Sequence, residues 1–495
     1  MSKSKIVTVL VVIGVFLLFS GIAAIAIIIS RGGTFTDDGL VLDSGVMRIF
    51  TEPDNIQATY YLNDERVDPQ DRRVFGIVEG DYKLRIEAEG FATWEKIVRV
   101  DSGLVLDVFA KLYPESFSAQ QFTNTNVDRA FFSPNGEYVY YFVKESPFGA
   151  NKGLWKIRLT QGGFIFNSFD SEPEKLSNLS TPLLNTVNGG DYEIVPSIDN
   201  NRLLLIDHAR DMRFILNTGS FTEAGIVNLD SLLGFKPDNV SWFNGSSSVI
   251  VQHEQVLFEY NISSGVSTLI TYSPEKPIVY AAGNGAVYIY DHLTQQLEIY
   301  QNQSVTPVEL ENVTLPQVIT ELHTPLNNER FVMLKSGAGS YYYLDTESSL
   351  IRQIQDTAIS FHQFAQDGRS ALFTKDKRVF TYTVREIIAR NTIETKLTDT
   401  GFVLDSEDDT AGFVPQSTHI LHYANGEDHT ISIADKDGAN HVVLLQNAGI
   451  KNSDFSVDSD GSTFVVLLTD EIGDQESANA NLYTIDLQTP NPAGQ

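Results

Sequence analysis

The sequence contains no cysteine among its 495 residues. Disulfides, zinc–thiolate sites, iron–sulfur clusters and thiol catalysis are therefore excluded, and the hydrophobic cores must hold the fold without cross-links. Basic residues are also few, because 35 Lys and Arg stand against 64 Asp and Glu, for a formal net charge of −29. Such an acidic excess repels phosphate backbones and no Lys/Arg cluster offsets it, so we expect no nucleic-acid partner.

Known catalytic signatures are missing as well. There is no Gly-x-Ser-x-Gly elbow, no His-Glu-x-x-His helix, no phosphate loop and no dinucleotide glycine pattern. The stretch Asp458–Gly461 resembles the opening of a calcium loop but lacks the glutamate that such a loop needs, so it is predicted to be a turn. We therefore predict a protein that is not an enzyme, with no catalytic residue and no cofactor.

The longest apolar run, Ile6–Ile29, carries no charge. As a helix it spans the roughly 30 Å hydrocarbon core of a bilayer. Lys3 and Lys5 precede it and Arg31 follows it, which predicts a cytoplasmic stub at residues 1–5 and export of the rest. The expected location is the cell membrane, with a single pass at residues 6–29.

A cleaved signal peptide is the alternative for this run. Ala24-Ile25-Ala26 matches the small-residue cleavage pattern, but the apolar core of a signal peptide is usually about 7–15 residues long. Cleavage there would also leave Ile27–Ile29 as an apolar new terminus. The pattern therefore favours an uncleaved anchor.

After a spacer at residues 30–45, short alternating segments predict a small Ig-like β-sandwich at residues 46–113. In Tyr82–Ala88, apolar residues occupy one face and charged residues the other, the pattern of a half-buried antiparallel strand. Six such segments occur before residue 113. This fold class is all-β.

The stretch Val78–Phe91 resembles the core of the PEGA domain, with a glycine-bearing turn, a strand and a Gly-aromatic pair in the same order. Glu52–Ala58 stands where that family has Pro-x-Gly-Ala, but this copy lacks the glycine. The resemblance implies a surface-exposed adhesion or spacer module that contacts cell-wall glycan. Phe91 and Trp94 are then candidates for stacking on a sugar; the alternative is that they pack the sandwich.

After a linker or entry strand at residues 114–127, a two-part unit recurs eight times in residues 128–488. Each copy has a polar turn, a hydrophobic strand, a hairpin and a second strand. The spacing averages about 47 residues, as in four-stranded propeller blades, and each blade needs neighbours to bury its faces. The paired segments cover residues 133–142 and 153–159, 197–207 and 212–220, 242–252 and 256–265, 272–283 and 286–294, 324–334 and 341–348, 364–374 and 378–384, 414–423 and 429–438, and 456–468 and 481–489.

The copies resemble the WD40-like repeats of exported bacterial propellers of the Tol-system type, in which a Ser-Pro-Asp-Gly turn precedes the second strand. Ser133–Gly136 comes close to that turn, and Asp367-Gly368 and Asp460-Gly461 keep its end. The resemblance implies a β-propeller, and the eight copies predict eight blades, followed by a tail at residues 489–495. Seven blades are the alternative, because the fourth copy is compressed.

Two stretches of the propeller are candidates for contacts. The irregular stretch Gly162–Gly190 contains Phe164, Phe166 and Phe169, which are predicted either to meet a partner or to cover a blade edge.

The second stretch is a histidine pair. If Asn425-Gly426 forms a two-residue turn, His422 faces His429 across a hairpin. Such a pair is a weak candidate for a metal site or a pH-sensitive contact, against the alternative of an ordinary surface pair.

We therefore expect an extracytoplasmic binding or scaffold protein of the cell envelope, tethered by residues 6–29. Its propeller would present a face to an envelope protein or to glycan, and its sandwich would act as a spacer or touch the cell wall. The alternative is a propeller-based hydrolase or lyase that acts on envelope polysaccharide or peptide. Several Asp, Glu or His side chains converging at the centre of the ring would favour that alternative.

Overall fold

The computed structural model describes residues 14–23, 34–36, 39–41, 44–54, 56–144, 152–159, 172–178, 181–219, 226–311, 313–354, 358–387, 392–415, 417, 419–426, 429–446, 449–469 and 479–490. Residues 14–23 are helical and lie inside the predicted span at residues 6–29. The rest of that span and the stub at residues 1–5 lie outside the described residues. Within the described part of the chain, no helix combines the length and the apolar character needed to cross a membrane.

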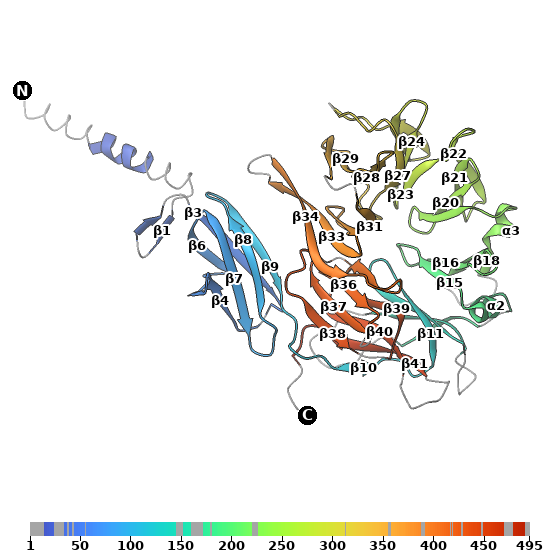
Figure 1. Cartoon of the computed structure of the whole chain (residues 1–495), viewed down its shortest axis with the longest axis horizontal. Helices are drawn as coiled ribbons and strands as arrows, with labels where there is room; N and C mark the ends of the chain where they lie inside the picture. The colour runs from blue at the N-terminus through green and yellow to red at the C-terminus, as the bar shows by residue number, and fades with distance from the viewer. Residues whose placement is uncertain are drawn as a thin grey trace, which may run out of the picture. The chain divides into compact units, whose positions relative to one another are not determined.

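The chain divides into two compact units (Figure 1). Unit 1 holds Met1–Ser116 and the C-terminal segment from Gln488, and unit 2 holds the described residues between Phe117 and Leu487. Each unit has its own hydrophobic clusters. The two are therefore described separately.

Unit 1 is a β-sandwich of a three-stranded and a four-stranded sheet. The three-stranded sheet has the order β6-β3-β9 and the four-stranded sheet the order β5-β4-β7-β8. Strands β3 and β9 are parallel, and the other neighbours are antiparallel. The strands are β3 (Ser44–Glu52), β4 (Ala58–Leu62), β5 (Glu65–Val67), β6 (Arg73–Val78), β7 (Gly80–Ala88), β8 (Trp94–Val100) and β9 (Val105–Lys111).

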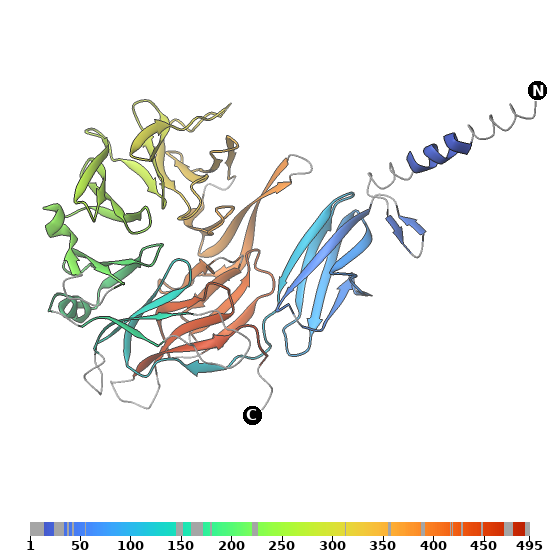
Figure 2. The ribbon, with the colours of Figure 1, turned by 180° about the vertical axis from the view of Figure 1, so that it is seen from behind.

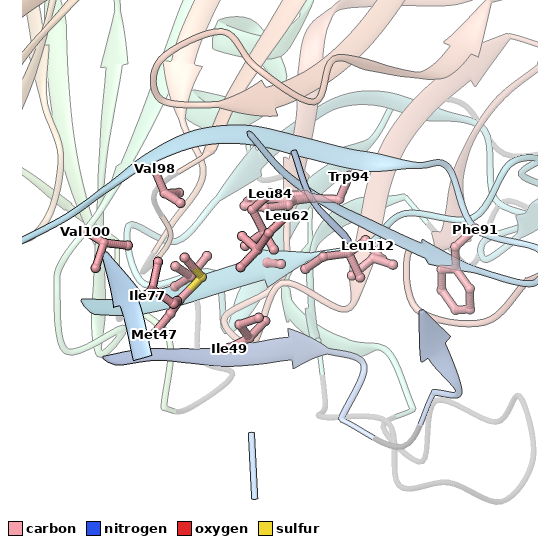
Figure 3. Packing of buried hydrophobic residues seen from close by; sticks show 13 residues of the cluster. Met47, Ile49, Leu62, Ile77, Leu84, Phe91, Trp94, Val98, Val100 and Leu112 are labelled. Atoms are coloured by element: carbon pink, nitrogen blue, oxygen red, sulfur yellow. The ribbon is translucent and has the colours of Figure 1, made fainter. Parts of the chain in front are cut away.

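The core of the sandwich lies between these two sheets (Figure 3). Leu84 and Ile86 of β7 are fully buried and Tyr82 and Ala88 pack against the same cluster, which confirms the predicted alternation. The structure has seven strands where six segments were predicted, because β5 is a short polar strand with no apolar alternation. Residues 30–45, predicted as a spacer, contain the hairpin β1 (Thr34–Thr36) and β2 (Gly39–Val41) and the start of β3.

Unit 2 contains eight four-stranded antiparallel sheets within its described residues. We number them in chain order from the first sheet to the eighth. The first four are β11 (Val127–Phe132), β12 (Tyr138–Val143), β13 (Gly153–Arg158) and β14 (Glu174–Ser177); β15 (Tyr192–Pro196), β16 (Arg202–Asp207), β17 (Met212–Asn217) and β18 (Ile226–Asn228); β19 (Asn239–Phe243), β20 (Ser248–His253), β21 (Val256–Asn261) and β22 (Val266–Tyr272); and β23 (Val279–Ala282), β24 (Val287–Asp291), β25 (Gln296–Gln301) and β26 (Ser304–Pro307).

The remaining four sheets follow the same plan. They are β27 (Ile319–His323), β28 (Phe331–Ser336), β29 (Tyr341–Asp345) and β30 (Leu350–Gln353); β31 (Ser360–Phe364), β32 (Ser370–Lys375), β33 (Arg378–Ile387) and β34 (Thr392–Val403); β35 (Thr410–Phe413), β36 (His419–Ala424), β37 (Thr430–Asp435) and β38 (Val442–Gln446); and β39 (Ile450–Val457), β40 (Thr463–Thr469) and β41 (Ala480–Asp486) with β10 (Ala119–Gln121).

The sheets form a closed ring, which defines unit 2 as a β-propeller (Figure 2). Hydrophobic clusters join each of the first six sheets to the next, and the eighth sheet to the first; no such cluster of described residues joins the seventh and eighth. Those two meet through the rings of Tyr423 and Phe455, whose centroids are 5.9 Å apart. Strand β10 completes the eighth sheet by pairing with β41, so the two ends of the unit are fastened to each other.

Some predicted boundaries differ from the observed strands. The stretch 162–190 is not wholly irregular, since it holds β14 and the helix α2 (Thr181–Gly189), while α3 (Leu229–Leu233) follows β18. Strand β14 was missed because Glu174–Ser177 is short and polar. The fourth copy is a complete sheet whose predicted segments correspond to β23 and β24, one strand earlier than in the other copies.

The turns between the first and second strands pack against one another. Ser133 Oγ accepts a hydrogen bond from the backbone N–H of Tyr138 (2.9 Å), which closes the first of these turns. Gly136 has a φ of +71°, and a Cβ there would lie 2.9 Å from the backbone nitrogen of Ser459 in the eighth sheet. Glycine is therefore required both by the backbone conformation and by the neighbouring turn. The stretch 458–461 is a turn, as predicted.

Candidate functional site

Asp, Glu or His side chains that converge at the centre of the ring would favour the enzyme alternative. First strands of neighbouring sheets contact each other, as β23 does with β27 and β31 with β35, so these strands lie innermost in the ring. Within the described residues, no group of three or more His, Asp or Glu is arranged to hold a metal ion. Two smaller charged clusters are present.

The first cluster lies where the fifth sheet meets the sixth. Glu321 Oε1 accepts a hydrogen bond from Lys335 Nζ (2.6 Å), and its other oxygen lies 3.4 Å from His323 Nε2. Tyr341 donates its hydroxyl to the same carboxylate (3.3 Å), and the His323 ring stacks on Phe361 with centroids 4.1 Å apart. The cluster therefore brings a carboxylate, an ammonium, an imidazole and a phenol together.

Burial and pairing set the protonation of this cluster. Burial raises the pKa of Glu321, but the hydrogen bonds and charges of Lys335 and His323 outweigh it and leave the pKa below its ordinary value. Burial lowers the pKa of His323, and Glu321 offsets only part of that effect. At neutral pH the group is therefore a carboxylate paired with a lysine, beside a neutral imidazole.

The second cluster fastens the eighth sheet to the first. Arg129 Nη2 donates to Asp454 Oδ1 (3.3 Å), and Asp454 Oδ2 accepts the backbone N–H of Ala130 (3.0 Å). Tyr192 of the second sheet donates its hydroxyl to Asp128 (2.9 Å). These partners lie on three successive sheets, so the cluster stabilises their junction.

The two candidates for stacking on a sugar are not available at the surface. Phe91 is 6% exposed and Trp94 is 2% exposed, and both belong to the sandwich core (Figure 3). Trp94 begins β8 opposite Ile86, so its side chain points between the sheets. Both residues therefore pack in the sandwich core, as the alternative had it. Their burial argues against the sugar contact that was considered for this pair.

The histidine pair does not form. Tyr423 pairs with Ile431, and His422 pairs with Ser432 rather than with His429, because the loop is longer than the two-residue turn that was predicted. His422 Nε2 donates to the carbonyl oxygen of Val403 (3.0 Å), whereas Nδ1 of His429 lies 3.0 Å from the hydroxyl of Tyr423. The two imidazoles therefore have different partners. Phe164, Phe166 and Phe169, the other contact candidates, lie outside the described residues.

A third region, which the sequence did not single out, lies on the sandwich. Strand β3 pairs in parallel with β9, which places Val46 beside Val105, Arg48 beside Asp107 and Phe50 beside Phe109. Met47 and Ile49, which alternate with these residues, are buried in the core, so the three pairs point outward. Phe75 of β6, the third strand, is also exposed. We call Val46, Arg48, Phe50, Phe75, Val105, Asp107 and Phe109 the aromatic face.

Large apolar side chains on the aromatic face are open to solvent. Phe109 is 74% exposed, Val105 is 58% exposed and Phe75 is 46% exposed. The Phe50 and Phe109 rings stack with centroids 5.0 Å apart, and Arg48 Nε donates to Asp107 Oδ1 (2.6 Å) between the two apolar rows. Exposed apolar groups gathered on one sheet face mark an interaction surface more often than scattered ones do.

The opposite outer face of the sandwich has a different character. On the four-stranded sheet Lys83 pairs with Glu95 (2.9 Å) and Arg85 pairs with Glu87. Ile97 is a large apolar side chain there, and it is 76% exposed. The sandwich therefore has one charged outer face and one aromatic outer face.

A hollow of about 500 Å³ opens on unit 2. Its lining is polar and acidic, with Glu309, Glu311 and Glu347 beside Thr346, Ser348 and Ser349. Glu347 lies 3.2 Å from Nη1 of Arg330. The lining carries no apolar contact surface of the kind seen on the aromatic face.

Comparison with known proteins identifies no family. No family model matches the chain, and no curated protein matches it. Solved structures with a similar fold include the WD40 domain of SCAP from fission yeast (TM-score 0.43, 10% identity, 75% of this chain and 98% of that one). Others are the Cps50 (Swd1) β-propeller domain of Myceliophteria thermophila (0.37, 9%, 76% and 100%) and an oligogalacturonate lyase from Vibrio parahaemolyticus (0.36, 9%, 59% and 88%). At these scores the assignment of unit 2 as a propeller rests on its own sheet order.

Proposed function

We propose that this chain is a membrane-anchored, extracytoplasmic binding or scaffold protein of the cell envelope. In this proposal residues 6–29 are the anchor, unit 1 is a PEGA-like module close to the membrane, and unit 2 is an eight-bladed propeller that offers a second contact face for envelope protein or glycan. The observation that supports a binding role is the aromatic face, where Phe75, Val105 and Phe109 are left in water at the cost of unburied apolar area.

The charged clusters of the propeller fit the same role. Lys335 and Glu321 pair with each other, as do Arg129 and Asp454, and each pair joins strands or sheets. The Glu321–Lys335 pair ties β27 to β28 within the fifth sheet, and the Arg129–Asp454 pair ties the first strands of two neighbouring sheets.

The test is cross-linking of the full chain in intact envelopes, read by mass spectrometry. We expect a saturable contact that is lost in a Phe75→Ser, Phe109→Ser double variant. The matched control is Ile97→Ser, which removes an equally exposed apolar side chain from the charged outer face. Equal cross-linking by all three proteins would contradict a binding role for the aromatic face.

A second candidate is a hydrolase or lyase that acts on envelope polysaccharide or peptide. It is favoured by the cluster of Glu321, His323, Lys335 and Tyr341, in which a general acid and a general base lie within hydrogen-bond distance. Turnover of wall glycan or peptides by the purified chain, abolished in Glu321→Gln, would favour this candidate over the binding role.

A further inference from the structure

The aromatic face combines exposed apolar rings with arginines in one layer. The Arg48 guanidinium carbon lies 5.6 Å from the centroid of the Phe50 ring, and that of Arg72 lies 5.7 Å from it. Arg73 pairs with Arg48 in the register of β6 and β3 and is exposed. Two guanidinium groups thus lie within cation–π distance of the Phe50 ring.

The charges around this face balance, unlike those of the chain as a whole. Three arginines, Arg48, Arg72 and Arg73, are offset by Asp107, Asp54 and the exposed Asp71 next to Arg72. The chain as a whole carries a formal net charge of −29. An anionic surface would therefore be repelled less by this face than by most of the rest of the molecule.

We infer that the aromatic face docks on the headgroup layer of an anionic lipid bilayer. This inference rests on the proposed binding function and names the partner of the aromatic face. Phe109, Phe75 and Val105 enter the boundary between headgroups and acyl chains, and the arginines bind lipid phosphates. Aromatic rings and snorkelling basic side chains occupy this layer in membrane-bound proteins.

The chemistry of the face favours lipid over a second copy of the chain. The Arg48–Asp107 ion pair lies in the middle of the face, so a dry protein interface would have to remove both charges from water. A headgroup layer stays hydrated and supplies phosphates as partners for the guanidinium groups. The face therefore suits a wet, anionic and partly apolar environment.

The length of the chain also places the face near a bilayer. The uncharged run ends at Ile29, and β3 begins at Ser44. Thr34 pairs with Val41 in the β1–β2 hairpin, so the hairpin residues add almost no reach. The residues between Ile29 and Ser44 that lie outside the hairpin span at most about 35 Å when fully extended. If the run is inserted in a membrane, the start of the sandwich at Ser44 therefore lies within about 35 Å of the membrane surface.

The test uses residues 34–495, so that the apolar run does not itself bind lipid. None of the described hydrophobic clusters contains a residue before Met47, so this deletion removes no residue from them. Sedimentation is measured with vesicles of phosphatidylcholine containing 30% phosphatidylglycerol, and with vesicles of phosphatidylcholine alone. We expect binding to the anionic vesicles that weakens as salt is raised.

Three variants make the test specific. Phe75→Ser with Phe109→Ser is expected to lower the partition coefficient at least tenfold, while Ile97→Ser changes it less than twofold. Arg72→Gln with Arg73→Gln is expected to remove the preference for anionic vesicles. Melting curves of the variants confirm that they fold, since all the altered side chains are exposed.

Other outcomes would overturn the inference. Absence of vesicle binding, or equal binding by the double phenylalanine variant, excludes a lipid partner. Self-association in sedimentation velocity that the same variant abolishes would make a second copy the occupant instead. If the protein does not sediment with vesicles but its cross-linking in envelopes still depends on Phe75 and Phe109, the proposed binding function stands. Only the inference of a lipid partner is then rejected. If neither depends on them, both proposals fail.

Discussion

Gln366 Nε2 donates a hydrogen bond of 2.6 Å to the carbonyl oxygen of Pro134. Gln366 belongs to the turn between β31 and β32 in the sixth sheet, and Pro134 to the corresponding turn of the first sheet. The seventh and eighth sheets lie between them in the ring. The bond therefore joins two turns that are not neighbours in the order of the sheets, and it brings them together at one face of the propeller.

This bond is expected to stabilise the ring. Gln366→Ala should lower the free energy of unfolding by about 1 kcal/mol, the usual net value of a neutral hydrogen bond. The control is Gln353→Ala, at the exposed end of an outer strand. Urea unfolding followed by far-UV circular dichroism measures both, and an equal effect of the two changes would contradict a specific role for Gln366.

Trp94 is expected to matter for stability rather than for glycan. Trp94→Ala leaves a cavity in the sandwich core and should cost about 3–5 kcal/mol. Trp94→Phe should cost much less, because the indole N–H has no hydrogen-bond partner in the described structure. Chemical denaturation separates the two variants. Loss of binding to isolated cell wall by a stable Trp94→Phe protein would restore the sugar-stacking interpretation.

Arg330 and Asp345 form the best-paired ion pair of the fifth sheet. Arg330 Nε donates to Asp345 Oδ1 (2.6 Å), and Ser348 Oγ donates to the other oxygen (2.7 Å). Burial raises the pKa of Asp345, but these bonds outweigh it and leave the pKa below its ordinary value. The stabilisation is therefore present above pH 4 and is lost as the pH falls below it.

Asp345→Ala should cost about 2–3 kcal/mol at pH 7, because Arg330 loses its buried carboxylate partner and keeps the exposed Glu347. The difference from wild type should shrink as the pH falls below about 4, because the unfolded chain then binds a proton on Asp345 that the folded carboxylate takes up only at lower pH. Urea titrations at pH 7 and pH 3 measure this. A difference that does not depend on pH would show that packing, not charge, explains the cost.

Asp458 has the opposite dependence on pH. Burial, together with the neighbouring Asp460, raises the pKa of Asp458 to about 6. The folded state therefore binds this proton more tightly than the unfolded chain, so stability rises as the pH falls from 7 to about 4. Asp458→Asn keeps an oxygen acceptor for the N–H groups of Ser462 and Thr463.

We expect Asp458→Asn to be at least as stable as wild type at pH 7 and to lose the rise between pH 6 and pH 4. Melting temperatures at several pH values test this. Ser459→Asn, a change in the same turn, is the control and should keep the rise. A strongly destabilised Asp458→Asn protein at pH 7 would show that the ionised carboxylate is needed.

His422 is expected to act in packing and not in metal binding. Its ring stacks on Phe402 with centroids 4.6 Å apart, and burial lowers its pKa. The neutral imidazole is thus the folded form, so its contribution is complete above about pH 6.5 and falls as the unfolded chain gains protons below that pH. His422→Gln should cost about 1–2 kcal/mol at pH 7 and leave zinc uptake unchanged, as measured by melting and by equilibrium dialysis.

Much of the fold follows from local pattern. The alternation in Tyr82–Ala88 specifies a strand with Leu84 and Ile86 inward, since side chains along a strand point to opposite faces in turn. The turns at Ser133–Gly136 and Asp458–Gly461 follow from residues that suit tight turns. The eight repeated units mark the positions of the eight sheets because each repeat contains two neighbouring apolar strands of one sheet.

The outward side of β9 could not be determined from its sequence. Val105, Asp107 and Phe109 alternate with Leu106, Val108 and Ala110, and both sets are largely apolar. Only the parallel pairing with β3 and the packing against the other sheet decide that Phe109 stands in water. For Phe91 and Trp94 the sequence left both sugar stacking and packing in the sandwich open, and only the tertiary structure shows that both side chains are buried in the core.

The sequence by itself determined the all-β class, the order of sandwich and propeller, the acidic surface and the absence of thiol chemistry, because alternation, turn residues and composition are local properties of the chain. Only the tertiary structure decided that residues near 120 close the ring with β41, that His422 and His429 are not paired, and that aromatic side chains gather on one face. Each of these depends on register and on contacts between segments far apart in the chain, which side-chain alternation alone does not specify.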